Sequence, residues 1–158
     1  MRVDYRHVFP RAVQAMLGVE AAVHASTLEP ELLELVKIRA SQLNRCGYCL
    51  DMHTKDAAAI GVAPQRLHLV AAWTEAPVYS ERERAALAWC EYLTPTTSPG
   101  GPDDPYDLVA AFDPDETVAF TLAVVAIKES NRLAVGLRSP VDCRQRTPPA
   151  YGKRSTGR

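Results

Sequence analysis

The chain has 158 residues, 47% of them hydrophobic, and its 18 Lys and Arg against 19 Asp and Glu leave a net charge of −1. This length suffices for one domain with a substantial core. The balanced charge excludes a field that would recruit nucleic acid or an anionic membrane. The longest apolar stretch, around Val118 to Ile127, is about half of a bilayer span, and the N-terminus has no secretory apolar segment. We therefore expect a soluble, cytoplasmic protein with no structural disulfide framework.

Prolines and glycines divide the first half of the chain into helical blocks, and no period-2 alternation predicts strands. A first helix is expected from about Arg11 to Ala25, and a second begins with Pro30 in its first turn. A third runs from about Gly47 to Gly61, and Pro64 opens a short fourth helix. The sequence predicts an all-α fold.

The second half begins with a capping box formed by Ser80 and Glu83, which predicts a helix through Leu93. The proline- and glycine-rich segment from Thr94 to Pro105 is expected to be a loop.

A second capping signal, at Asp113 and Glu116, predicts a long helix to about Leu137. Because its middle is apolar nearly all round, this helix is expected to lie centrally or at a subunit interface. We assign residues 1–140 to one helical domain and residues 141–158 to a basic, mobile tail.

The motif with the most chemical information is Cys46-Gly47-Tyr48-Cys49, followed four residues later by His53. On a helix, positions i, i+3 and i+7 share one stripe, so both thiols and the imidazole face the same way. Two cysteines at this spacing can close a disulfide, and the histidine can exchange a proton with Cys49. The pattern is typical of a redox site.

Glu34 joins this site only if the chain turns, because in one straight helix it would lie about 18 Å from Cys46. Asn44 tolerates the left-handed conformation that ends a helix, and Gly47 adds backbone freedom after it. In a helix hairpin folded there, Glu34 and His53 lie at nearly the same depth. The carboxylate would then orient His53 as a base toward Cys49.

Two opposing effects determine which of the two cysteines is the thiolate. The N-terminus of the helix favours Cys46, whereas the Glu34–His53 pair favours Cys49. We assign Cys49 as the nucleophile and Cys46 as its resolving partner.

The stretch from Glu31 to Gly61, together with residues 79–89 and Asn131-Arg132-Leu133-Ala134-Val135, resembles the AhpD-like alkylhydroperoxidases of the carboxymuconolactone decarboxylase superfamily. The resemblance covers roughly residues 3 to 141. Glu34, Cys46, Cys49 and His53 fall where this family has its proton relay and redox pair.

The resemblance implies a helical fold with the CxxC near the start of a helix, assembly into trimers or hexamers, and reduction of a hydroperoxide or disulfide through a Cys46–Cys49 disulfide. It implies no other cofactor, and a thiol reductant that in some relatives is a lipoyl-bearing protein.

Other interpretations of the motif remain open. The four residues could bind zinc, or the cysteines could be buried thiols without a function. The chain could instead be a decarboxylase-like lyase, or a non-catalytic oligomer whose disulfide is a redox sensor.

The remaining cysteines and histidines receive no functional role. Cys90 is expected in the core, and Cys143 is expected to be an incidental thiol in the tail. His7, His24 and His68 have no companion acid or thiol at a useful spacing and are expected at the surface or at helix caps.

Overall fold

The computed structural model describes residues 1–95 and 112–141, and every regular element in these residues is helical. The predicted all-α class is therefore confirmed. The elements are α1 (Tyr5–Val8), α2 (Pro10–His24), α3 (Pro30–Leu43), α4 (Gly47–Ala59), α5 (Pro64–Leu69), the 3-10 turn η1 (Val70–Ala72), α6 (Glu81–Leu93) and α8 (Pro114–Gly136). The predicted loop, apart from Thr94 and Pro95, and the predicted tail from residue 142, with Cys143, lie outside the described residues.

The capping boxes expected at Ser80 and Asp113 are both present. The Ser80 hydroxyl accepts from the Glu83 backbone N–H at 3.3 Å, and the Glu83 carboxylate accepts from the Ser80 N–H at 2.9 Å. Asp113 and Glu116 make the reciprocal pair at 2.8 and 3.3 Å. Each box satisfies two backbone donors that a helix start leaves without an intrahelical partner, so local sequence fixes where α6 and α8 begin.

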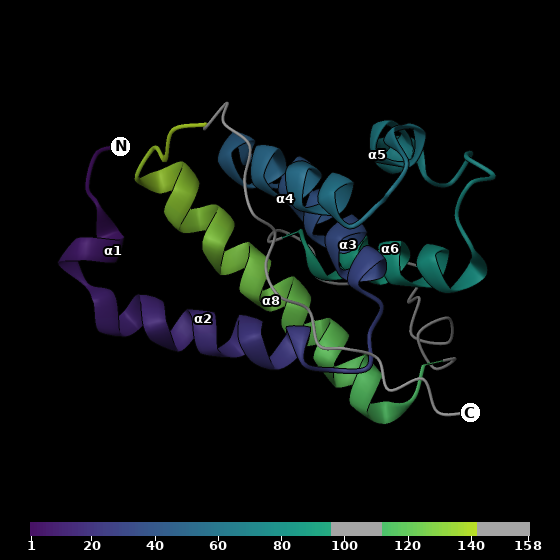
Figure 1. Cartoon of the computed structure of the whole chain (residues 1–158), viewed down its shortest axis with the longest axis horizontal. Coiled ribbons are helices and arrows are strands. Elements are labelled where there is room, and N and C mark those ends of the chain that lie inside the picture. The colour runs from purple at the N-terminus through teal and green to yellow at the C-terminus, as the bar shows by residue number, and fades with distance from the viewer. Residues whose placement is uncertain (96–111, 142–158) are drawn as a thin grey trace.

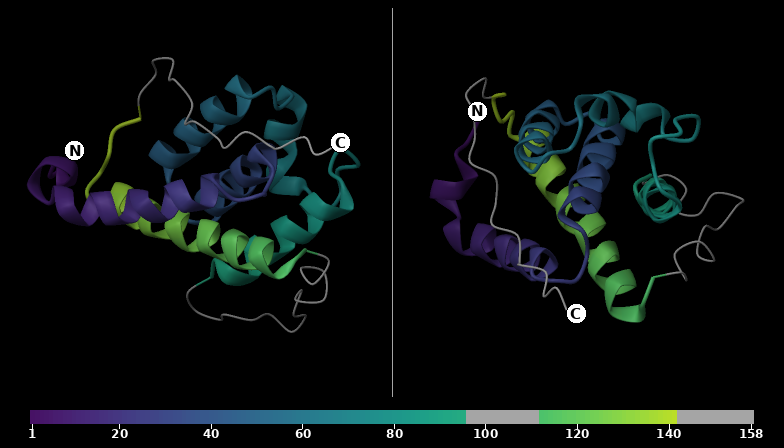
Figure 2. Two further views of the ribbon diagram at one scale, coloured as in Figure 1. Left: turned by 60° about the horizontal axis from the view of Figure 1, so that its bottom comes forward. Right: turned by 45° about the vertical axis from the view of Figure 1, so that its right-hand side comes forward.

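Helix α3 lies at the centre of the molecule. Seven consecutive residues, 32–38, are buried, and the helix packs against α4, α6 and α8. In Figure 1, α8 runs diagonally across the molecule with α2 along one side and α4 along the other, and Figure 2 shows α3 enclosed between α8 and α6. Side chains on α3 therefore reach neighbours in several directions.

Helix α8 has one buried face and one exposed face. Phe120, Val124 and Ile127 are buried in the core, whereas Val118 is 60% exposed and Val125 is 44% exposed. The uniformly apolar sequence of its middle therefore does not correspond to burial on all sides within one chain.

Two groups of buried apolar residues hold the helices together, and α3 contributes to both. The first, the α8-side core, includes Leu33, Val36 and both motif cysteines. The second, the α5-side core, includes Leu35, Ile38 and Leu87.

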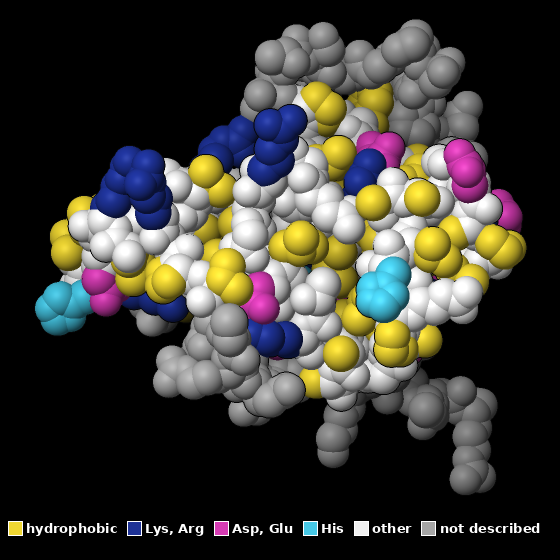
Figure 3. Space-filling view, turned by 90° about the horizontal axis from the view of Figure 1, so that it is seen from above, with side chains coloured by type: hydrophobic (Ala, Val, Ile, Leu, Met, Phe, Trp, Pro, Cys, Tyr) yellow, Lys and Arg dark blue, Asp and Glu magenta, His cyan; other side chains and the backbone are white. Residues whose placement is uncertain are grey.

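The N-terminal segment is attached to the end of α8, since the Arg2 backbone N–H donates to the Leu137 carbonyl at 2.7 Å. On the face shown in Figure 3, Lys and Arg side chains gather toward the end formed by α1 and the C-terminus of α8, and hydrophobic side chains lie dispersed among polar ones. Among the described helices, none combines the length and hydropathy needed to cross a membrane.

Candidate active site

The turn between α3 and α4 places the CxxC motif at the start of α4. The left-handed residue in this turn is Arg45, with φ 54°, whereas Asn44 has a right-handed conformation. The expectation of a left-handed Asn44 is wrong by one residue, because its side-chain amide is used elsewhere: it donates to the Ala40 carbonyl at 2.9 Å and to Asn131 Oδ1 at 3.0 Å. The predicted helix hairpin itself is present.

Cys46 is the N-cap residue of α4. Its sulfur accepts from the Cys49 backbone N–H at 3.3 Å, and its own N–H donates to the Ser41 carbonyl at 2.9 Å. Both thiols are reduced, and each residue is 1% exposed. The pair is thus held between the end of α3 and the first turn of α4.

Glu34 of α3 and His53 of α4 meet as the hairpin predicts. Glu34 Oε2 lies 2.9 Å from His53 Nδ1, with the two residues 0% and 3% exposed. An ionised carboxylate accepts hydrogen bonds, so a Glu34 carboxylate favours the tautomer with the proton on Nδ1, which leaves the Nε2 lone pair free. This arrangement suits His53 to the predicted role of a base at Nε2.

The two thiols differ in pKa. The Cys49 thiol donates to Cys46, and with the backbone N–H groups of Tyr48 and Cys49 and the Asn131 side chain it lowers the pKa of Cys46 to about 7, although burial opposes the shift. The same sulfur–sulfur hydrogen bond, burial and the charge on Cys46 raise the pKa of Cys49. In the reduced pair the lower pKa therefore belongs to Cys46, chiefly through the hydrogen bond from the Cys49 thiol and then through backbone N–H groups at the start of α4. The nucleophilic role of Cys49 stays a prediction.

A charged cluster includes Glu34 and adjoins His53. Of its members, only Glu34 was predicted from the sequence to belong to the site. Lys37, 2% exposed, places its ammonium 3.4 Å from Glu34 Oε1, 2.6 Å from Glu20 Oε1 and 2.5 Å from His24 Nε2. We call Glu20, His24, Glu34 and Lys37 the Lys37 cluster. The expectation that His24 is a surface or capping residue without a companion is wrong, because Glu20 lies one turn before it on α2 and the Lys37 side chain reaches it from α3.

Spacing within single helices could have indicated part of this cluster. Lys37 follows Glu34 by three residues, and His24 follows Glu20 by four, which are the spacings at which side chains on one helix face meet. Nothing in the spacing indicates that the two pairs meet each other.

A cavity of about 290 Å³ borders the redox pair and the Lys37 cluster. Cys49, His53 and Met52 line it from α4, and Glu20 and His24 line it from α2. Of the two motif cysteines, Cys49 is the one in this wall. A small molecule in the cavity would therefore meet Cys49 and His53 together.

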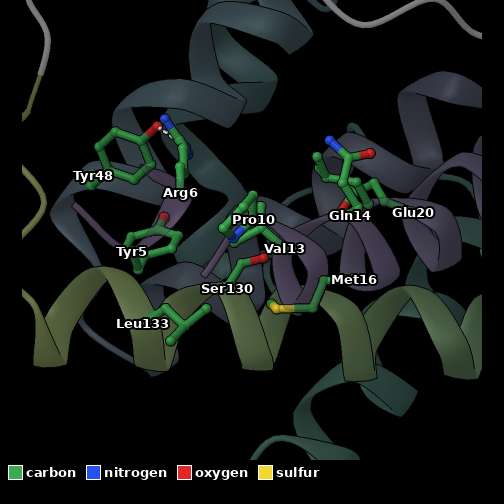
Figure 4. A pocket seen from close by; sticks show the side chains of 11 residues that line it. Tyr5, Arg6, Pro10, Val13, Gln14, Met16, Glu20, Tyr48, Ser130 and Leu133 are labelled. Atoms are coloured by element: carbon green, nitrogen blue, oxygen red, sulfur yellow. Dashed lines mark hydrogen bonds between the residues drawn. The ribbon is translucent and has the colours of Figure 1, made fainter. Parts of the chain in front are cut away.

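A second cavity, of about 390 Å³, shares the wall formed by Tyr5, Arg6 and Tyr48 (Figure 4). Arg6 donates to the Tyr48 hydroxyl at 2.8 Å, and its guanidinium lies 5.6 Å from the Tyr5 ring centre and 5.8 Å from that of Tyr48. The hydrogen bond with Tyr48 raises the pKa of Arg6. Apolar residues such as Val13 and Leu133 also line this cavity. This cavity offers an amphipathic approach to the site.

The four residues that could bind zinc do not form one cluster of ligand atoms in the described part of the chain. The trio with ligand atoms within 4.8 Å of one another is Glu34, His53 and Asp56, and neither cysteine belongs to it. Glu34 and His53 already bond each other, and the Lys37 ammonium against Glu34 would repel a cation. This arrangement favours proton transfer over metal binding.

An all-helical fold with a CxxC at a helix start, a Glu–His pair and an adjoining cavity defines a class of helical thiol proteins. Residues 9–92, more than half of the chain, match the carboxymuconolactone decarboxylase family. The chain is 35% identical to the uncharacterized protein YdfG of Bacillus subtilis (strain 168) over 137 residues, or 86% of this chain and 93% of YdfG. The chain belongs to the carboxymuconolactone decarboxylase family.

Solved structures agree with this assignment. The crystal structure of ATU0492 from Agrobacterium tumefaciens, a protein of unknown function for which an AhpD antioxidant defence role has been suggested, matches with a TM-score of 0.85 and 39% identity over 90% of this chain and 99% of that chain. The debrominase Bmp8, in a complex with 2,3,4-tribromopyrrole, has the same fold, with a TM-score of 0.77 and 19% identity over 87% of this chain and 74% of that chain.

Proposed function

We propose that the protein is a thiol-dependent peroxidase and disulfide oxidoreductase of the AhpD-like type. The observation that carries this proposal is the 2.9 Å contact between Glu34 and His53 beside a reduced CxxC pair whose Cys49 lines a cavity. A base, a nucleophile and a second thiol are then available to one small molecule.

In the first step His53 Nε2 takes the proton of Cys49, and Glu34 stabilises the resulting imidazolium. The Cys49 sulfur attacks the terminal oxygen of a hydroperoxide, and the O–O bond breaks. Cys49 becomes a sulfenic acid, and the leaving alkoxide takes a proton from His53 to depart as an alcohol.

In the second step the Cys46 thiolate attacks the Cys49 sulfur, forming the Cys46–Cys49 disulfide and releasing the sulfenic oxygen as hydroxide, which takes a proton from solvent to become water. The lowered pKa of Cys46 supports this resolving role, because the attacking sulfur is already ionised near neutral pH. A dithiol, such as that of a lipoyl-bearing protein, then reduces the disulfide and becomes a disulfide itself.

The proposal includes a homo-oligomer, a trimer or hexamer, as the assembled form. The exposed apolar residues Val118, Leu122 and Val125 recur along one side of α8 and support burial against another copy. Sedimentation of the purified protein measures the assembly state.

The test is the rate at which reduced, metal-free protein loses its CxxC thiols to hydrogen peroxide and to an organic hydroperoxide, with mass spectrometry locating the disulfide. We expect fast formation of Cys46–Cys49, slowed about a hundredfold in Glu34→Gln and His53→Gln. Cys90→Ser is the matched control, because Cys90 is buried away from both cavities. Thiols that react no faster than free cysteine would contradict the peroxidase proposal.

The lyase alternative predicts an activity that does not need the thiols. A double variant, Cys46→Ser with Cys49→Ser, separates the two functions. Intact turnover of a lactone acid by this variant would favour the lyase, whereas loss of peroxide reduction without any lyase activity supports the redox function.

A further inference from the structure

The Lys37 cluster contains a buried ammonium group that the proposed chemistry does not use. Lys37 is 2% exposed, yet its three N–H donors have three acceptors, from Glu20, His24 and Glu34. A charge this deeply buried is costly unless it is paired and hydrogen-bonded, so the site is built around it.

The protonation of its partners is consistent with this role. Burial, and then the Lys37 charge, lower the pKa of His24 to about 4, so His24 is neutral and accepts through Nε2. Burial favours the neutral form of Glu20, but the Lys37 ammonium outweighs it and lowers the pKa of that carboxyl group. Lys37 therefore lies between two carboxylates, one at the cavity wall and one bonded to His53.

The two oxygens of Glu34 have different partners. Oε1 lies against the Lys37 ammonium, and Oε2 lies against His53 Nδ1. The nearby ammonium favours the ionised form of Glu34, and the second carboxylate oxygen is directed at His53. Without it, a carboxyl group that is 0% exposed would lose the Lys37 cation that lies 3.4 Å from its Oε1.

We propose that Lys37 is a positioning residue of the redox site: held by Glu20 and His24, it keeps Glu34 ionised and aimed at His53 Nδ1, so that His53 presents an unprotonated Nε2 to the cavity. Its effect on peroxide reduction rests on the proposed function. Its effect on the histidine does not.

Charged and titratable groups face this unit from each neighbouring segment. They are Glu20 and His24 on α2, Lys37 on α3, Cys46 at the N-cap of α4, Cys49 and Asp56 on α4, and Tyr5, Arg6 and Tyr48 at the cavity wall, while α8 contributes the neutral Ser130 and Asn131. Removing a positive charge here favours protonation of the Glu34–His53 pair, and removing a negative charge disfavours it.

The first experiment measures the rate of disulfide formation with an organic hydroperoxide from pH 5 to pH 9. We expect Lys37→Met to move the acidic limb of the profile upward by about one pH unit and Glu20→Gln to move it downward by a smaller amount. Shifts of opposite sign distinguish an electrostatic role from general damage to the fold. Unchanged limbs in both variants would overturn the proposal.

Lys55→Met is the matched control. Lys55 is also a helical lysine paired with a carboxylate, 2.7 Å from Asp51, but it lies on the partly exposed side of α4 and does not line the cavity. Its profile should coincide with that of the unaltered protein. A shift equal to that of Lys37→Met would also overturn the proposal.

A second measurement needs no turnover. In reduced protein with ¹⁵N-labelled histidine, the imidazole nitrogen shifts of His53 report its tautomer, and His53→Gln assigns the signals. We expect the Nδ1–H form in the unaltered protein and a changed tautomer or titration in Lys37→Met and Glu20→Gln. Identical His53 titrations in all three proteins would reject the role of Lys37, whereas a changed titration without peroxide reduction would reject only the proposed function.

Discussion

The two buried faces of α3 are equally inaccessible to solvent but differ in chemistry. One face carries Glu34 and Lys37, which are 0% and 2% exposed, and the other carries Leu35 and Ile38, which are 1% and 0% exposed. The polar face meets α2 and α4 through ion pairs, and the apolar face packs into the α5-side core. Burial alone therefore does not separate residues that support the fold from residues that support chemistry. The groups that each buried side chain contacts make this distinction.

The largest effect is expected at the redox pair, which lies next to the polar face of α3. Cys49→Ser should lower the rate of peroxide reduction by about three orders of magnitude or more, because it removes the proposed nucleophile. Cys90→Ser changes a thiol that is also buried but whose hydrogen-bond partners in the described residues are the Val36 carbonyl and the Thr94 hydroxyl. It should retain the rate per folded molecule, measured by single-turnover oxidation. Equal losses of rate in Cys49→Ser and Cys90→Ser would contradict a catalytic role that Cys49 has and Cys90 lacks.

The next effect belongs to the apolar face. Leu35→Ala should lower the free energy of unfolding by about 3 kcal/mol, the usual cost of a cavity left by a buried leucine. Urea denaturation followed by circular dichroism measures it. Thiol reactivity per folded molecule should stay unchanged, and a large loss of reactivity would mean that the two faces are coupled.

A smaller effect depends on pH. Because the pKa of Cys46 is lowered to about 7, this thiol holds fewer protons in the native reduced protein than in the unfolded chain between about pH 7 and pH 8.5. Up to about pH 8, before the raised pKa values of Cys49 and Cys90 oppose this contribution, the free energy of unfolding of the reduced protein should therefore rise with pH, and this stabilisation is lost as the pH falls through 7. Thiolate absorbance near 240 nm should show one group titrating near pH 7. The oxidised protein, which lacks both thiols, should show neither change.

The smallest effect lies outside both faces. Ser80→Ala removes the side-chain acceptor of the α6 capping box and should cost about 1 kcal/mol of stability. The thiolate titration should not move, since α6 supplies no hydrogen bond to either motif thiol. A shifted titration would show that the position of α6 influences the redox pair.

The local parts of the fold could be predicted from the sequence. The capping residues Ser80 and Asp113 fix helix starts through bonds to residues three positions away, and Gly61, with φ 98°, follows α4 where the helix was expected to stop. The four-residue helix α1 was not predicted, because so short a segment has no hydrophobic period.

The contact between Glu34 and His53 was predictable because one turn joins α3 and α4, so counting residues from that turn places both at one depth. The place of Asn131 at the site and the contacts between α2 and α3 could not be predicted, because they depend on how helices distant in sequence pack. Asn44 bonds a residue 87 positions away, and Lys37 bonds His24 across two helices. That the pKa of Cys46, rather than that of Cys49, is lowered also required the structure, because the largest cause is the direction of the Cys49 thiol hydrogen bond.

The labelling rate of Cys90 measures how often the core of the native protein opens. Burial raises its pKa to about 12, and its side chain is inaccessible, so an alkylating reagent reacts with it only when the core opens. Mass-resolved labelling of this one thiol over time therefore counts unfolding events under native conditions. The same sample, read at Cys46 and Cys49, reports the redox state of the site.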